Sequence, residues 1–220
     1  MPMALPSPPL HALWQRTRQR WARRQLSDPA YAFLFDPPPP DEYVALDCET
    51  TGLNTRTDDI ISIGAVRIRG RRILTSERLE LLVQPQCQVP AESIRVHRLR
   101  TMDVAHGLPV QEAMHRLLHF IGSRPLVGYY LEFDVAMLNR AVRPLIGIRL
   151  PQPQIEVSRL YYDYRFRQLP PYQQHDNADI DLRFDTLMAD LDLPVREAHD
   201  ALNDAVMAAM AFIRLRELQG

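Results

Sequence analysis

The chain has 220 residues, a net charge of −1, 46% hydrophobic residues and two cysteines. This length suits one domain with a sizeable core plus an appendage, and so few cysteines exclude a disulfide scaffold. No apolar run reaches the roughly 18 to 20 residues of a membrane helix, and the N-terminus lacks the apolar stretch of a secretion signal, so we expect a cytoplasmic protein without a membrane partner.

Residues 1–40 are expected to form a basic arm. Its first 30 residues hold five arginines and one acid, a net charge of +4, whereas the rest of the chain carries −5. One face of a helix would be formed by four residues that recur at helical spacing, Leu10, Trp14, Thr17 and Trp21. This spacing predicts an amphipathic helix that docks on the domain, or that binds nucleic acid or another protein. Four consecutive prolines end the arm and predict a stiff spacer or a ligand for a proline-binding module.

The segment 43–48 is mostly apolar and β-prone, which predicts a strand. Asp47 and Glu49 are two positions apart, so their carboxylates project from the same face of that strand, and Cys48 between them points into the core. Two adjacent buried negative charges are costly unless a cation lies between them. Hard oxygen ligands at this spacing suit Mg²⁺ or Mn²⁺.

The residues after this strand favour close contact with a ligand. Thr50, Thr51 and Gly52 are small, and glycine lets the backbone approach a bound molecule closely. Leu53 then places an apolar side chain where a solvated turn would favour a polar one. The run Asp47-Cys-Glu-Thr-Thr-Gly-Leu53 resembles the first motif of the DEDD 3′-to-5′ exonucleases, the superfamily that includes the proofreading epsilon subunit of bacterial DNA polymerase III.

Two further motifs of that superfamily follow in its order. Residues 126–138 resemble the second motif, with Asp134 at the turn from a strand into a helix. Residues 198–205 resemble the third motif, in which His199 and Asp204 are separated by four residues. This histidine and its spacing are typical of the DEDDh branch.

Two segments near these motifs concern the substrate. Residues 94–99 are similar to the family segment whose histidine, here His97, lies near the terminal nucleotide. Many relatives have a His-Asn pair before the second-motif aspartate, where this chain has Tyr129 and Tyr130. These tyrosines either stack on a base or sugar or fill the core.

Periodicity predicts the remaining elements. We expect strands over 59–68, 72–84 and 125–129, and helices near Met102 and over 110–121, 135–142 and about 200–218. A strand that leads into a helix is typical of a mixed sheet covered by helices. The resemblance implies that 41–220 form an α/β domain with the ribonuclease H-like fold, a mixed β-sheet flanked by helices. Residues 155–179, rich in Tyr, Pro and Gln, match no pattern that we can interpret.

The resemblance also implies residue roles. Asp47 would bridge two divalent metal ions, Mg²⁺ or Mn²⁺, with Glu49 and Asp204 on the first ion and Asp134 acting largely through water. His199 would be the general base, since imidazole accepts protons near neutral pH. The expected substrate contacts are Thr50, Thr51, Gly52, Leu53, His97 and Tyr130. Three other acids, Asp103, Glu132 and Asp200, are expected to be surface acids.

Three functions follow from these observations. The first is a 3′-to-5′ exonuclease that releases nucleoside monophosphates from single-stranded or frayed DNA ends, alone or with a DNA polymerase. The second is an RNA-trimming enzyme of the same branch, and the third is a non-catalytic module that binds nucleic acid or a polymerase. All five motif positions are intact, which favours an enzyme.

Overall fold

A computed structural model describes residues 20–175, 178–196 and 199–219 of the protein. Its centre is a five-stranded sheet in the order β3-β2-β1-β4-β5. The strands are β1 (Glu42–Thr50), β2 (Ile60–Arg69), β3 (Arg72–Leu82), β4 (Leu126–Gly128) and β5 (Gln154–Glu156). The first three pair antiparallel, whereas β4 is parallel to β1 and β5 is parallel to β4, so the sheet is mixed.

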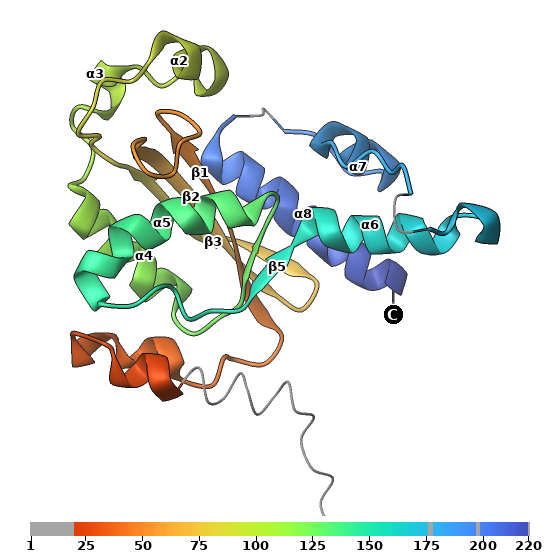
Figure 1. Cartoon of the computed structure of the whole chain (residues 1–220), viewed down its shortest axis with the longest axis horizontal. Helices are drawn as coiled ribbons and strands as arrows, with labels where there is room; N and C mark the ends of the chain where they lie inside the picture. Colours follow the sequence, from red (N-terminus) through yellow and green to blue (C-terminus); the bar gives the residue numbers. More distant parts are fainter. Residues whose placement is uncertain (1–19, 176–177, 197–198, 220) are drawn as a thin grey trace, which may run out of the picture.

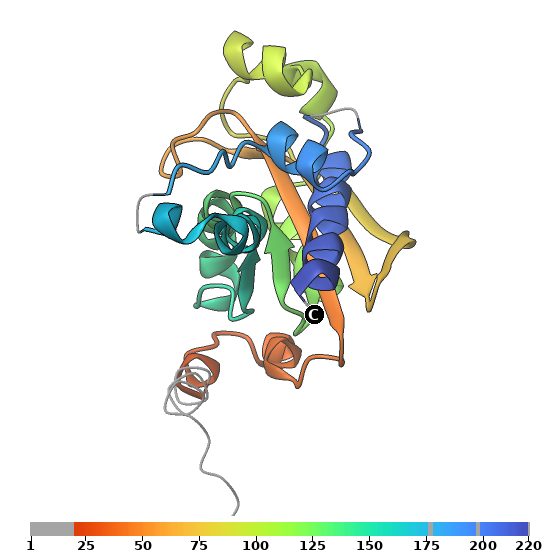
Figure 2. The ribbon, with the colours of Figure 1, turned by 90° about the vertical axis from the view of Figure 1, so that its right-hand side faces the viewer.

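Helices cover both faces of this sheet (Figures 1 and 2). They are η1 (Pro29–Phe35), α2 (Ala91–His97), α3 (Thr101–Val104), α4 (Val110–Ile121), α5 (Leu131–Ile146), α6 (Val157–Gln168), η2 (Pro171–Gln173), α7 (Phe184–Asp190) and α8 (Ala201–Gln219). One buried cluster joins the sheet to η1, α4 and α5, and a second joins it to α6, α7 and α8. The predicted α/β fold, a mixed sheet flanked by helices, is confirmed.

The alternation of side chains along β1 decides which way the acidic residues point. Val44, Leu46 and Cys48 lie in the cluster with α4 and α5, whereas Ala45 lies in the cluster with α8. Because alternate residues of a strand share a face, Asp47 is on the α8 side of the sheet. Cys48 is 8% exposed, which confirms that it points into the core.

The N-terminal segment docks on the domain through residues that periodicity did not single out. Tyr31 and Leu34 of η1 are buried in the cluster of α4 and α5, and the Ser27 N–H donates to the Ile146 carbonyl at 3.0 Å. Trp21, which we expected to dock, is 63% exposed. The other predicted anchor, Trp14, lies outside the described residues, as do Leu10 and Thr17. Residues 20–24 are helical.

Most predicted elements are present with shifted ends. The helix over 110–121 is confirmed as α4, and the one near Met102 is the four-residue α3. The helix predicted over 135–142 starts earlier and ends later, as α5. Residues 155–179, where no pattern was found, contain the end of β5 together with α6 and η2. Within the described part of the chain, no helix combines the length and apolar character needed to cross a membrane.

Candidate active site

Three acidic side chains meet on the α8 face of β1. Asp47, Glu49 and Asp204 each offer a carboxylate oxygen, and these atoms lie within 4.8 Å of one another. Asp47 is paired across the sheet with Gly64 of β2. A Cβ at Gly64 would lie 2.2 Å from the backbone carbonyl carbon of Ala201, in the first turn of α8. Glycine at this position therefore lets α8 approach the sheet closely enough to bring Asp204 beside Asp47.

The start of α8 also positions the predicted general base. His199 has a positive φ of 64°, and its backbone N–H donates to Oδ2 of Asp204 at 3.1 Å. Asp200 is exposed, and its Oδ1 accepts from the Asn203 N–H at 2.9 Å, as a helix cap does. The same turn therefore orients the Asp204 carboxylate and holds His199 next to it.

Asp134 reaches β1 from the opposite helix layer. It lies in the first turn of α5, is 4% exposed, and accepts from the Cys48 N–H through Oδ1 at 3.0 Å. The short strand β4 pairs with β1 only at Val44 and Ala45, so Cys48 lies beyond the paired stretch. The carboxylate of Asp134 thus takes the place of a neighbouring strand and ties α5 to the end of β1.

Glu156, which the sequence analysis missed, fixes the turn before α5. Tyr130 has a φ of 52°, and its N–H and that of Leu131 donate to the two carboxylate oxygens of Glu156 at 3.0 and 2.8 Å. The same carboxylate accepts from the backbone N–H and the hydroxyl of Ser158 at 3.1 and 2.9 Å. One acid at the end of β5 therefore caps both α5 and α6. In the sequence, an acid directly before a helix is a weak signal of such a cap.

The loop after β1 presents Leu53, which is 85% exposed. Internal hydrogen bonds close this loop: the Asn54 N–H donates to Oδ2 of Asp58 at 2.7 Å, and the Thr50 hydroxyl donates to the Gly52 carbonyl at 2.8 Å. A Cβ at Gly52 would lie 2.5 Å from the same Asp58 oxygen. Any side chain at position 52 would therefore displace the Asp58 carboxylate that closes the loop.

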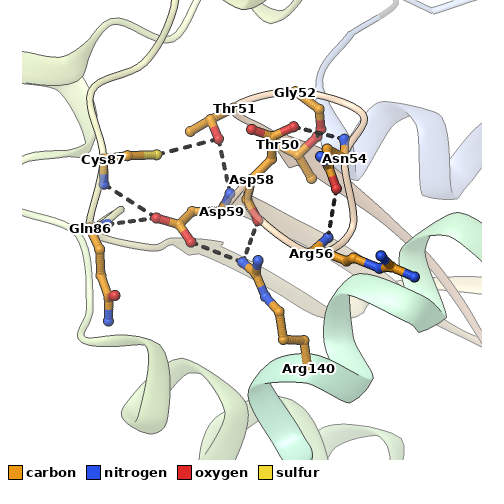
Figure 3. Close-up of polar contacts among 10 residues, drawn as sticks. All are labelled: Thr50, Thr51, Gly52, Asn54, Arg56, Asp58, Asp59, Gln86, Cys87 and Arg140. Atoms are coloured by element: carbon orange, nitrogen blue, oxygen red, sulfur yellow. Dashed lines mark hydrogen bonds and ion pairs between the residues drawn. The ribbon is translucent and has the colours of Figure 1, made fainter.

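Asp59 anchors this loop to two other segments (Figure 3). Its Oδ1 pairs with the Arg140 guanidinium of α5 at 2.9 Å, and its Oδ2 accepts from the N–H groups of Gln86 and Cys87 at 2.8 and 3.3 Å. Thr51 and Asp59 exchange two hydrogen bonds of 2.9 Å, and Thr51 is 1% exposed. Arg140 also donates to the Asp58 carbonyl. The base of the loop is thus held rigidly while Leu53 projects from it.

The predicted catalytic residues line one hollow of about 850 Å³, which we call the catalytic hollow. Its walls contain the predicted catalytic set Asp47, Glu49, Asp134, His199 and Asp204. They also contain two predicted substrate contacts, Leu53 and Tyr130, and the exposed Glu132. Thr50, Thr51 and Gly52 are not in its walls and instead shape the loop.

The two neighbouring tyrosines have different environments. Tyr129 stacks on Phe184 with ring centroids 4.4 Å apart, and its hydroxyl donates to the Leu182 carbonyl at 2.8 Å. Tyr130 is 60% exposed on the wall of the catalytic hollow. Both tyrosines therefore line the catalytic hollow: Tyr129 is half-buried and held by Phe184 and Leu182, whereas Tyr130 is the more exposed of the two.

His97 is a buried histidine with a free ring nitrogen. It is 5% exposed, and its Nδ1 accepts from the Leu99 N–H at 3.1 Å. Its Nε2 has no hydrogen-bond partner within the described residues. Burial, followed by the nearby charge of His199, lowers the pKa of His97, which favours the neutral ring with a proton on Nε2. His97 is outside the walls of the catalytic hollow.

Burial, with repulsion between neighbouring acids as a second cause, raises the pKa of every carboxyl in the acidic cluster, which we define as Asp47, Glu49, Asp134 and Asp204. The pKa of Glu49 rises to about 7, that of Asp134 to about 8 and that of Asp204 to about 6, chiefly by burial. The pKa of Asp47 lies well above its usual range because of burial and then repulsion by Asp134 and Asp204. A cation would relieve this repulsion, and clustered carboxylate oxygens fit a hard divalent ion.

The chain is similar to several known proteins. A family model described as an exonuclease, RNase_T, matches residues 44–212. A DNA polymerase III subunit epsilon of Aquifex aeolicus is 25% identical over 175 residues, which cover 80% of each chain. An epsilon-like protein of Rhodobacter capsulatus is 31% identical over 174 residues, 79% of this chain and 23% of that protein.

Longer proteins and solved structures are also similar. A PolC-type DNA polymerase III of Thermotoga maritima is 26% identical over 80% of this chain, which covers just 12% of that polymerase. Exonuclease I of E. coli, solved with a dA16 oligonucleotide, has a TM-score of 0.67 at 14% sequence identity. The match covers 81% of this chain and 41% of the exonuclease I chain. Exonuclease X in complex with 5′ overhanging duplex DNA has a TM-score of 0.61 at 21% sequence identity. This match covers 80% of this chain and 91% of the exonuclease X chain. These structures share the predicted fold.

The raised pKa values predict a pH-dependent stability in the absence of divalent ions. The carboxyls of the acidic cluster hold protons to higher pH in the native state than in the unfolded chain, where they titrate near pH ~4. The native state therefore binds more protons, and its stability falls as the pH rises from about 4 to about 8. In EDTA, we expect Tm to fall by roughly 5 to 10 °C over this range.

Glu49→Gln removes one of these titrating groups and should make the fall in Tm smaller. Glu132→Gln is the matched control, since Glu132 lies on the wall of the same hollow but is exposed, and it should keep the full fall. Differential scanning fluorimetry across the pH range measures both. An equal fall in Glu49→Gln and wild-type protein would contradict the assignment of the pH dependence to the acidic cluster.

Proposed function

Since the chain belongs to the exonuclease family, whose model matches residues 44–212, we propose that it hydrolyses DNA from the 3′ end with divalent metal ions. The observation that carries this proposal is that four carboxylates and a histidine, from the ends of β1, α5 and α8, line one hollow. The names of the epsilon relatives and the oligonucleotide in the exonuclease I structure support DNA as the substrate. A DNA polymerase in the cytoplasm is the partner that we propose.

The acidic cluster is the proposed site of two ions, Mg²⁺ or Mn²⁺. Asp47 lies at its centre, with Glu49 and Asp204 beside it and Asp134 across the end of β1. When bound, such ions supply an acidified water and neutralise charge on the scissile phosphate. The chain supplies the negative charge that holds the ions, and its hydrogen bonds to Asp134 and Asp204 fix two of the four carboxylates.

His199 is the proposed general base. It lies on the wall of the catalytic hollow, directly before the helix that carries Asp204, and its backbone is tied to that carboxylate. Its imidazole takes the proton of the attacking water, and the exposed position lets this proton pass on to solvent. Asp204 of the acidic cluster and the base thus share one turn of backbone.

The exposed apolar groups form the proposed contacts to the terminal nucleotide. Leu53 and Tyr130 line the catalytic hollow, and each offers a surface on which a base can pack. Thr50, Thr51 and Gly52 act indirectly, since they shape the loop that carries Leu53. A hollow of about 850 Å³ is within the range of sites that hold small molecules, so it accommodates a nucleotide.

A panel of end-labelled substrates tests the direction and the substrate. With Mg²⁺ or Mn²⁺, we expect stepwise release of mononucleotides from the 3′ ends of single-stranded or mismatched DNA, because a frayed end enters the catalytic hollow without the cost of unpairing. The panel holds 3′- and 5′-labelled single strands, matched and mismatched duplexes, and RNA. Degradation from the 5′ end would contradict the direction, and faster hydrolysis of RNA would favour the RNA-trimming alternative.

Replacing His199 by Ala tests the base separately from the ions. General-base catalysis contributes about 10² to 10⁴-fold, so kcat should drop by that much while affinity for DNA persists. His106→Ala is the control, since His106 is also exposed but is not in the walls of the catalytic hollow. If His199→Ala keeps a kcat within about threefold of the wild-type value, His199 is not the base.

A further inference from the structure

A second hollow of about 450 Å³ adjoins the catalytic hollow. The two share three wall residues, Thr55, Glu132 and Ala136, so they lie side by side. The remaining walls come from α5 and from the segment that leads to β5. They are Val135, Asn139, Arg140, Arg143, Arg149 and Gln154. We call this space the arginine hollow.

The arginine hollow carries positive charge that no described residue neutralises. The guanidinium of Arg140 is paired with Asp59 and donates to the Asp58 carbonyl (Figure 3). Arg143 and Arg149 are exposed, and their side chains make no ion pair or hydrogen bond with any residue that the structure describes. Against these two free charges the walls hold a single acid, Glu132.

Some arginines are neutralised by an acid, as Arg69 and Arg124 are by Glu42 at 2.7 and 2.8 Å. Others, such as Arg72 and Arg78, are exposed without an ion pair to a described residue. Arg143 and Arg149 differ from these because both line one hollow beside the catalytic residues. Two unpaired guanidinium groups around one hollow repel each other, and a bound anion would relieve that repulsion. A guanidinium matches the geometry of a phosphate, to which it donates two parallel hydrogen bonds.

The position of the arginine hollow relative to the acidic cluster indicates which phosphate it would meet. Asp134 and Arg143 are on the same helix, α5, nine residues apart, or about 14 Å along its axis. A stacked strand carries a phosphate every ~3.4 Å, so about four nucleotides span this distance, and fewer do so in an extended strand.

We propose that the arginine hollow binds the sugar-phosphate backbone of the substrate strand, a few nucleotides upstream of the 3′ end that lies in the catalytic hollow. This inference rests on the proposed function, since it takes the 3′ end to be at the acidic cluster. Arg143 and Arg149 contact phosphates and read no sequence, as is usual for backbone contacts. The protein then binds strands long enough to reach both hollows more tightly than it binds short ones.

The test measures binding of fluorescent oligothymidylates by anisotropy in EDTA, so that no hydrolysis occurs. For a strand of about twelve nucleotides, Arg143→Gln/Arg149→Gln should weaken binding at least ~5-fold and flatten the slope of log K against log salt by about 1.4, or ~0.7 for each lost phosphate contact. For a dinucleotide the affinity should change less than ~2-fold, because such a strand is too short to reach the arginines even when it is extended. Arg143→Lys/Arg149→Lys keeps both charges and should keep most of the slope.

The matched control is Arg72→Gln/Arg78→Gln, which removes two exposed arginines of β3, at the opposite edge of the sheet. It should leave the affinity and the salt slope unchanged. An unchanged salt slope in Arg143→Gln/Arg149→Gln, or an equal loss in the control pair, would overturn the proposal. Failure of the proposed function is seen separately, as a wild-type protein that binds the long strand but releases no nucleotides with Mg²⁺ or Mn²⁺.

Discussion

Burial of the four carboxylates of the acidic cluster beside one another is the constraint on which the rest of this structure depends. Burial beside one another raises the pKa of each of them, so the native fold must hold them together against a free-energy cost. The absence of a side chain at Gly64 brings α8 onto the sheet, and the Cys48 N–H binds Asp134. Protons or cations are needed to neutralise the negative charge of the four carboxylates. This need for cations is the chemical basis of the proposed function.

The sequence predicted the pairing of Asp47 with Glu49 in the acidic cluster because that information is local. Alternation along β1 placed Asp47 and Glu49 on one face, and Cys48 on the other, and the structure has them there. The second and third motifs identified Asp134 and Asp204 by order and spacing. Their meeting with Asp47 is long-range, and it could be expected from the family resemblance but not from any local pattern.

The supports of the site were not predictable, because each acts between segments far apart in the chain. Asp59 and Arg140 are 81 positions apart, and Tyr130 and its partner Glu156 are 26 apart. Helix α6 was not predicted because its burial also lacks a local pattern. It buries only Val157, Ser158 and Tyr161, too few residues for a clear apolar period. Burial of Tyr31 within a basic, proline-rich arm likewise depends on contacts with α4 and α5.

Calorimetric titration with Mn²⁺ is the most direct test of the claim that the acidic cluster binds divalent ions. At pH 8, wild-type protein and the Glu132→Gln control should bind about two ions per chain, as expected for a two-metal site. Asp47→Asn should weaken this binding by at least ~10-fold, because Asp47 is buried and is repelled by all three other carboxylates of the cluster. Equal Mn²⁺ affinity in Asp47→Asn and wild-type protein would contradict the account.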